Sequence, residues 1–97
     1  MKTRDEVLKT LKGELHFLRQ KYGVKRLGLF GSHSRDEATE KSDIDILVAF
    51  ERPIGFFDFI DLEDYLKEKL GAEVELVTED ALKPLIKPRV TRETVYV

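Results

Sequence analysis

Two aspartates stand at positions i and i+2 near the middle of the chain, where Ser42-Asp43 leads into an apolar run, Ile44–Phe50. Side chains of a strand alternate between its two faces, so Asp43 and Asp45 leave the same face, about 6.6 Å apart along the backbone. Two converging carboxylates repel each other unless a cation lies between them, and hard oxygen ligands favour Mg²⁺ or Mn²⁺. The pair therefore indicates a metal site for phosphate chemistry, whereas an isolated Asp-x-Asp is also typical of a strand start whose acids face water.

A glycine and a serine, Gly31 and Ser32, end the preceding apolar run and stand ten residues before Asp43. Glycine lets the backbone approach a phosphate closely, and the Ser32 hydroxyl would lie beside the free amides of a helix start, where anions bind. The end of the first strand can lie beside the start of the second only if the two are antiparallel. We therefore expect a phosphate-binding turn beside the two aspartates.

The first half of the chain contains a helix and two strands that would position this site. Residues 3–6 have the capping-box pattern, and apolar residues then recur at helical spacing up to Tyr22, before Gly23. The run Val24–Phe30 favours a strand, and so does Ile44–Phe50. A short polar helix or loop is expected between the two strands.

The second half predicts a helix, a strand and a mixed tail. Residues 56–70 form an amphipathic helix that ends at Gly71, with Phe57 and Tyr65 off its apolar face, as second-layer packing or as a partner contact. That apolar face consists of Phe56, Phe59, Leu62, Leu66 and Leu70. Residues 73–78 alternate polar and apolar, which is typical of a strand with one polar face. The tail predicts a short helix and then a strand or extended end at residues 95–97.

These elements predict an α/β (α+β) fold in which helices pack on a small mixed β-sheet. The long helical crossover between the second and third strands favours a parallel pair, and 97 residues suffice for a single domain, residues 1–97. The chain has no cysteine, which excludes thiol nucleophiles and thiolate zinc sites. A net charge of -2 disfavours a polynucleotide partner, and with no apolar run of about 20 residues we expect no membrane span and a cytoplasmic protein.

The combination of Gly31-Ser32 with Asp43-x-Asp45, in the contexts LFGSHSR and SDIDILV, resembles the polymerase-β-type nucleotidyltransferase superfamily and, within it, the minimal stand-alone (MNT) branch. The resemblance covers nearly the whole chain. It implies that Asp43 and Asp45 hold two Mg²⁺ ions, or Mn²⁺, with a third acid from a later strand. It also implies that Gly31 and Ser32 grip the triphosphate of ATP or another nucleoside triphosphate, and that Arg35 contacts a phosphate. An acceptor hydroxyl would attack the α-phosphorus and release pyrophosphate.

The third carboxylate is expected to be Glu75, although the family usually has aspartate there. Val74 and Leu76 must face the core, so Glu75 points to the opposite face, and a parallel neighbour brings it beside Asp43 and Asp45. Glu73 has the same parity but lies at the start of the strand, where a solvent-facing acid is ordinary.

Two hypotheses for the partner follow from the resemblance. Stand-alone MNT domains commonly pair with an all-helical HEPN ribonuclease toxin and act as antitoxins by adenylylating one of its tyrosines. Alternatively, the chain is a non-catalytic binding module that neutralises a partner protein by occlusion. The intact motifs favour the enzyme, because binding alone places no demand on their spacing.

Other polar residues are less informative. We expect His33 to face solvent in a loop and His16 to be structural. The basic tail is either a solvated face or a contact for nucleotide or an acidic partner; it contains Lys83, Lys87, Arg89 and Arg92.

Overall fold

The computed structural model describes residues 3–35, 37–39 and 42–97. The helices and strands follow in the order predicted from the sequence. They are α1 (Arg4–Tyr22), β1 (Val24–Phe30), the 3-10 turn η1 (Gly31–His33), β2 (Ile44–Phe50), α2 (Phe56–Leu70), β3 (Val74–Thr78), the 3-10 turn η2 (Glu79–Ala81), α3 (Lys87–Glu93) and β4 (Val95–Tyr96). None of the described helices is long and apolar enough to cross a membrane.

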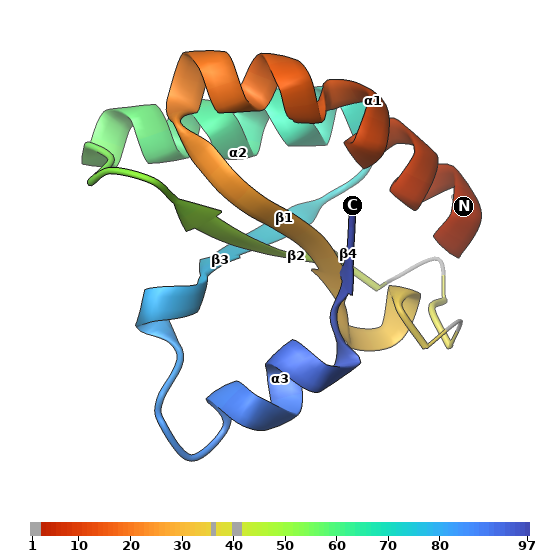
Figure 1. Cartoon of the computed structure of the whole chain (residues 1–97). Coiled ribbons are helices and arrows are strands. Elements are labelled where there is room, and N and C mark those ends of the chain that lie inside the picture. The colour runs from red at the N-terminus through yellow and green to blue at the C-terminus, as the bar shows by residue number, and fades with distance from the viewer. Residues whose placement is uncertain (1–2, 36, 40–41) are drawn as a thin grey trace.

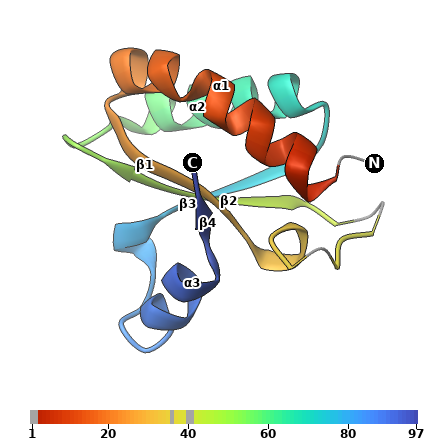
Figure 2. The ribbon, with the colours of Figure 1, turned by 45° about the vertical axis from the view of Figure 1, so that its right-hand side comes forward.

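The four strands form one mixed sheet in the order β3-β2-β1-β4. Strand β1 runs antiparallel to both β2 and β4, whereas β2 and β3 are parallel and are joined by α2. Helices α1 and α2 lie side by side on one face of the sheet, and α3 lies on the other (Figure 1). Figure 2 shows the same division from a second direction. The predicted α/β fold with a small mixed sheet is therefore confirmed.

The core fills the space between the sheet and the α1/α2 layer. Every second residue of β2 points into it, beginning with Ile44 and Ile46, so the intervening Asp45 points to the opposite face. Burying a leucine or isoleucine side chain contributes about 1.5–3 kcal/mol. The fully buried leucines of the two helices are Leu11, Leu18, Leu62, Leu66 and Leu70. The larger core therefore lies on the α1/α2 side of the sheet, while the other face carries Asp45 together with the buried Leu47.

The ends of α1 agree with the signals in the sequence. The side chain of Thr3 accepts a hydrogen bond from the backbone N–H of Glu6 at 3.2 Å, which caps the first turn. At the other end Gly23 has φ 73° and its N–H donates to the carbonyl of Arg19 at 3.1 Å. This left-handed cap turns the chain directly into β1.

One helical prediction is wrong. Phe56 was expected on the buried face of α2, but it is 71% exposed, and its ring lies edge-on to that of Phe57, which is 84% exposed. The helical periodicity predicts which side of α2 a residue is on. It does not predict whether the neighbouring elements reach far enough along the helix to cover its first turn. Tyr65, in contrast, is partly buried and donates a hydrogen bond to Glu14 of α1.

Candidate active site

Asp45 lies between the two elements that were predicted to surround it. On one side β1 runs antiparallel to β2 and pairs Phe30 with Asp45, which brings the turn after Phe30 beside this carboxylate. On the other side the parallel strand β3 pairs Glu75 with Asp45. The pairing on which the choice of Glu75 depended is therefore present, and its role as a ligand remains a prediction.

The turn after β1 brings the backbone into close contact with Asp45. Gly31 has φ +74°, and a β-carbon placed on it would lie 2.1 Å from Oδ2 of Asp45. The left-handed conformation and the close approach both require glycine. The carbonyl of Gly31 accepts hydrogen bonds from the Ser34 hydroxyl at 2.8 Å and from the Ser34 and Arg35 amides at 3.1 and 3.3 Å, which close the turn. Ser32 lies in this turn and is partly exposed.

The carboxylates of the site act on one another. The pKa of Asp45 is raised to about 6, first by burial, then by a hydrogen bond with Glu75 and the charge of Glu75, and further by the charges of Asp43 and Glu93. Burial and neighbouring negative charges both disfavour the ionised form. A cation placed here would relieve this repulsion.

These carboxylates fit a magnesium-type site. Among the described residues, no three His, Asp or Glu side chains are grouped tightly enough to enclose a metal on their own. Mg²⁺ does not need such an enclosure, because it is usually bound through one or two carboxylates together with waters and the phosphates of a substrate. Asp45 pairs with Glu75 across β2 and β3, and Asp43, directly before β2, is near enough for its charge to help raise the pKa of Asp45. The donor set is all oxygen and matches a hard divalent cation.

The competing acid, Glu73, is engaged elsewhere. Its carboxylate lies 3.5 Å from Nζ of Lys67 on α2, and its carbonyl accepts a hydrogen bond from the N–H of Ile44 at 2.9 Å. Glu73 therefore connects β3 to the helical layer, whereas Glu75 faces Asp45.

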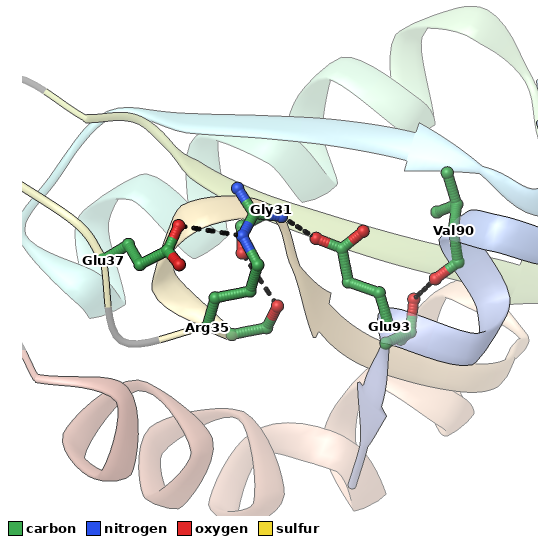
Figure 3. A network of polar contacts seen from close by, with 7 residues as sticks. Gly31, Arg35, Glu37, Val90 and Glu93 are labelled. Carbon is green, nitrogen blue, oxygen red and sulfur yellow. Dashed lines mark hydrogen bonds and ion pairs between the residues drawn. The ribbon is translucent and has the colours of Figure 1, made fainter.

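Arg35 stands beside the Gly31 turn in a network of ion pairs (Figure 3). Its Nε donates to Glu37 at 3.1 Å, and its Nη1 donates to Glu93, the last residue of α3. The hydrogen bond to Glu37 and the charges of Glu93 and Glu37 raise the pKa of the guanidinium above its usual value, against the effect of desolvation. Glu93 was not identified from the sequence. An acid in a short basic helix gives no local signal that it contacts Arg35, which lies 58 positions earlier in the chain.

The prediction for His33 is wrong. The side chain is buried, with 3% of its surface exposed, and its Nδ1 has no hydrogen-bond partner among the described residues. A short polar segment after a strand suggested a solvent-facing loop, but η1 curls back and places its third residue inward. His16 is exposed on α1.

The fold and this arrangement define a class of protein. A family model for the nucleotidyltransferase domain matches residues 9–97, and the chain belongs to this family. The chain is 45% identical to the protein adenylyltransferase MntA of Thermococcus cleftensis over 97 residues, which cover 100% of this chain and 98% of that protein. The family and the enzyme class predicted from the motifs are thus confirmed.

Solved structures show the same fold. A structure described as a minimal nucleotidyltransferase has a TM-score of 0.82 at 34% identity and covers 97% of this chain and 95% of its own. A chain in the complex of a tri-AMPylated Shewanella oneidensis HEPN toxin with an MNT antitoxin has a TM-score of 0.67 at 21% identity, over 93% of this chain and 70% of that one.

Proposed function

We propose that this chain transfers AMP from ATP to a hydroxyl group of a partner protein, a tyrosine of a HEPN-type toxin, and thereby acts as an antitoxin. The observation that carries the proposal is the placement of Asp45 between Gly31 and Glu75, which joins a phosphate-binding turn to a carboxylate site. The 45% identity to a protein adenylyltransferase over nearly the full length supports adenylylation, and the fold shared with a structure from an AMPylated toxin complex supports the partner.

The nucleotide would be held at the end of β1. The triphosphate would contact the backbone of the Gly31 turn and the hydroxyl of Ser32. The guanidinium of Arg35, at the end of the same turn, offsets the phosphate charge.

The acidic residues of β2 and β3 would hold the divalent cations. We assign Asp43, Asp45 and Glu75 as carboxylates for two Mg²⁺ ions, with Mn²⁺ as a substitute. When bound, such ions offset the charge that develops on the phosphate oxygens during transfer. Without cations the carboxylates and the triphosphate would repel each other, so we expect nucleotide binding to depend on added metal.

We assign to Glu75 the role of taking the proton of the acceptor. Its side chain is exposed on the open face beside Asp45, where an incoming hydroxyl can reach it. In the reaction the hydroxyl oxygen forms a bond to the α-phosphorus, the bond to pyrophosphate breaks, and the hydroxyl proton passes to a carboxylate. The side chains required are all acids and donors, so no protein nucleophile takes part.

A second candidate is binding without catalysis. Several apolar side chains are available to a partner, since Phe56, Phe57 and Leu85 are 71%, 84% and 96% exposed. Exposed apolar groups are common at protein interfaces. Neutralisation by occlusion would use such a surface and would require neither Asp45 nor ATP.

Co-expression with a HEPN-type toxin separates the two candidates. We expect mass spectrometry to show addition of whole AMP units to a tyrosine of that protein, in amounts that depend on ATP and on Mg²⁺. The double variant Asp43→Asn/Asp45→Asn should form the complex but add no AMP. A neutralised but unmodified toxin, with the same result for the double variant, would establish the binding module and refute adenylylation.

A further inference from the structure

The guanidinium of Arg35 uses only part of its hydrogen-bonding capacity. Arginine has five N–H donors in a planar fork. Nε donates to Glu37 and Nη1 to Glu93, and Nη2 has no partner among the described residues. One side of the fork is thus tied to Glu37 and Glu93, and no residue that the structure describes occupies the other side.

The two carboxylates hold Arg35 in different ways. Glu37 is two positions away on the same loop, and its side chain is 65% exposed, so water screens the contact. Glu93 comes from α3, 58 positions along the chain, and only 21% of its side chain is exposed. Glu93 therefore forms the less screened contact, and it joins the C-terminal helix to the turn of Gly31 (Figure 3).

The position of Glu93 is itself fixed by its neighbours. The next residue, Thr94, is buried and donates from its N–H and its hydroxyl to the carbonyl of Val90, at 3.0 and 2.7 Å. A β-carbon placed on Gly28 would lie 2.4 Å from the methyl group of Thr94, so the helix end rests directly on β1. Strand β4 then follows and pairs Gly28 with Tyr96. Glu93 is thus presented from a firmly packed segment.

Glu93 also lies near the metal-binding carboxylates. Besides burial and the closer Glu75, its charge contributes to the raised pKa of Asp45. A fourth negative charge at this place would oppose a triphosphate, but the contact with Arg35 neutralises it. Counted without Glu37, whose side chain is 65% exposed, the Arg35–Glu93 pair is neutral and adds no net charge to the site.

From these contacts we propose that Glu93 is a positioning residue for nucleotide binding: it holds the Arg35 guanidinium beside the Gly31 turn, with Nη2 left to contact the triphosphate. This inference rests on the proposed function. Holding a long side chain in place before the ligand arrives reduces the entropy that binding would otherwise cost. Because no described residue occupies Nη2, Arg35 can bind a phosphate there while it keeps Glu93, so Glu93 supports the contact instead of competing for it.

Titration calorimetry with ATP and Mg²⁺ tests this role. We expect the Arg35→Ala variant to bind ATP about tenfold to a hundredfold more weakly, because it loses an arginine hydrogen bond to a phosphate. We expect Glu93→Gln to weaken it about threefold to tenfold, since Arg35 remains but is no longer held. Glu93→Asp keeps the charge and should recover part of the loss. The matched control is Glu37→Gln, which removes the exposed partner and should leave the affinity within about twofold.

The double variant Arg35→Ala/Glu93→Gln distinguishes positioning from a structural effect. If Glu93 acts through Arg35, adding Glu93→Gln to Arg35→Ala causes no further loss of ATP affinity. A merely structural residue would lower the unfolding temperature without ATP and leave the affinity unchanged. In a transfer assay Glu93→Gln should raise KM for ATP more than it lowers kcat.

Two results would overturn the inference while the proposed function stands. In the first, Glu93→Gln binds ATP at least as tightly as the unchanged chain. In the second, the loss of ATP affinity in the double variant equals the sum of the losses in the two single variants. If the unchanged chain binds no ATP in the presence of Mg²⁺, the proposed function fails first and the inference fails with it.

Discussion

Gly31 and Asp45 are in such close contact that a single added carbon on the glycine would lie 2.1 Å from Oδ2 of the aspartate. The Gly31 turn and the acidic start of β2 are therefore one structural unit. A larger side chain at Gly31 would displace the carboxylate of Asp45 even without a ligand. The variant Gly31→Val should therefore disturb the carboxylate site as well as binding of a triphosphate. The glycine and the aspartate constrain each other across the β1–β2 pairing.

A Gly31→Ala variant should lose both stability and site geometry. A non-glycine residue in the left-handed region costs about 1–2 kcal/mol, and the contact with Asp45 adds to this. We expect a lower unfolding temperature and weaker binding of ATP with Mg²⁺. The matched control is Gly13→Ala, in the middle of α1 with no neighbour within 4 Å, which should stabilise the fold by about 0.5–1 kcal/mol. An unchanged melting curve for Gly31→Ala would contradict the contact.

The stability of the metal-free protein should depend on pH through Asp45. Burial, and after it Glu75, raise the pKa of this carboxyl from 3.8 to about 6. A group whose pKa is higher in the folded state contributes stability at low pH, and this contribution is lost as the pH rises through the folded value. Thermal melts in EDTA should therefore show a fall in stability between about pH 4 and pH 7 that is absent in Asp45→Asn.

The same Asp45→Asn variant should be at least as stable as the unchanged chain above pH 7 and inactive in AMP transfer. Glu51→Gln, at an exposed carboxylate outside the site, is the control and should keep the pH dependence. If Asp45→Asn has the same pH dependence of stability as the unchanged chain, Asp45 is not the source of that dependence.

Much of the fold could be predicted because its signals are local. The Thr3 cap, the Gly23 stop and the alternation around Asp45 each act within a few residues. The pairing of Asp45 with Glu75 needed only strand parity and the rule that a helical crossover joins parallel strands.

The unpredicted features depend on packing between distant segments. Glu93 contacts Arg35 only because α3 rests on β1 through Thr94, and no spacing in the sequence encodes that arrangement. His33 is buried for the same reason: the direction of η1 is set by the elements around it. Side chains that face a neighbour from a distant segment require the tertiary structure.

The buried carboxylate of Glu79 should be the main polar support of the sheet's open face. It accepts hydrogen bonds from Nη2 of Arg26 at 2.7 Å and from the hydroxyl of Tyr96 at 2.9 Å, which ties η2 to β1 and β4. Desolvation raises its pKa, but the hydrogen bonds and the charge of Arg26 outweigh this effect and the pKa is lowered. The stabilisation is therefore present above the ordinary carboxyl pKa and is lost as the pH falls through the lowered value.

We expect Glu79→Gln to destabilise the protein in urea unfolding, because the buried side chain keeps an acceptor but loses the charge that pairs with Arg26. Tyr96→Phe removes one neutral donor and should cost about 0.5–1.5 kcal/mol. Equal stability of Glu79→Gln and the unchanged chain at neutral pH would show that the network contributes nothing.

Glu73, directly before β3, and Glu75, within it, provide the sharpest test of the active site, because they have the same chemistry and differ in what they face. Glu75 pairs with Asp45, whereas Glu73 pairs with Lys67. If Glu75 accepts the proton of the acceptor hydroxyl, Glu75→Gln should lower the transfer rate about a hundredfold or more, with a much smaller effect on ATP binding. Glu73→Gln should leave the rate nearly unchanged.

Glu75→Asp shortens the side chain to that of the residue the family usually has. This change removes one rotatable bond and should retain or raise the transfer rate. Single-turnover transfer to the partner protein, measured beside ATP binding by calorimetry, separates the chemical step from affinity. Transfer by Glu75→Gln at the rate of the unchanged chain would reduce the site to Asp43 and Asp45.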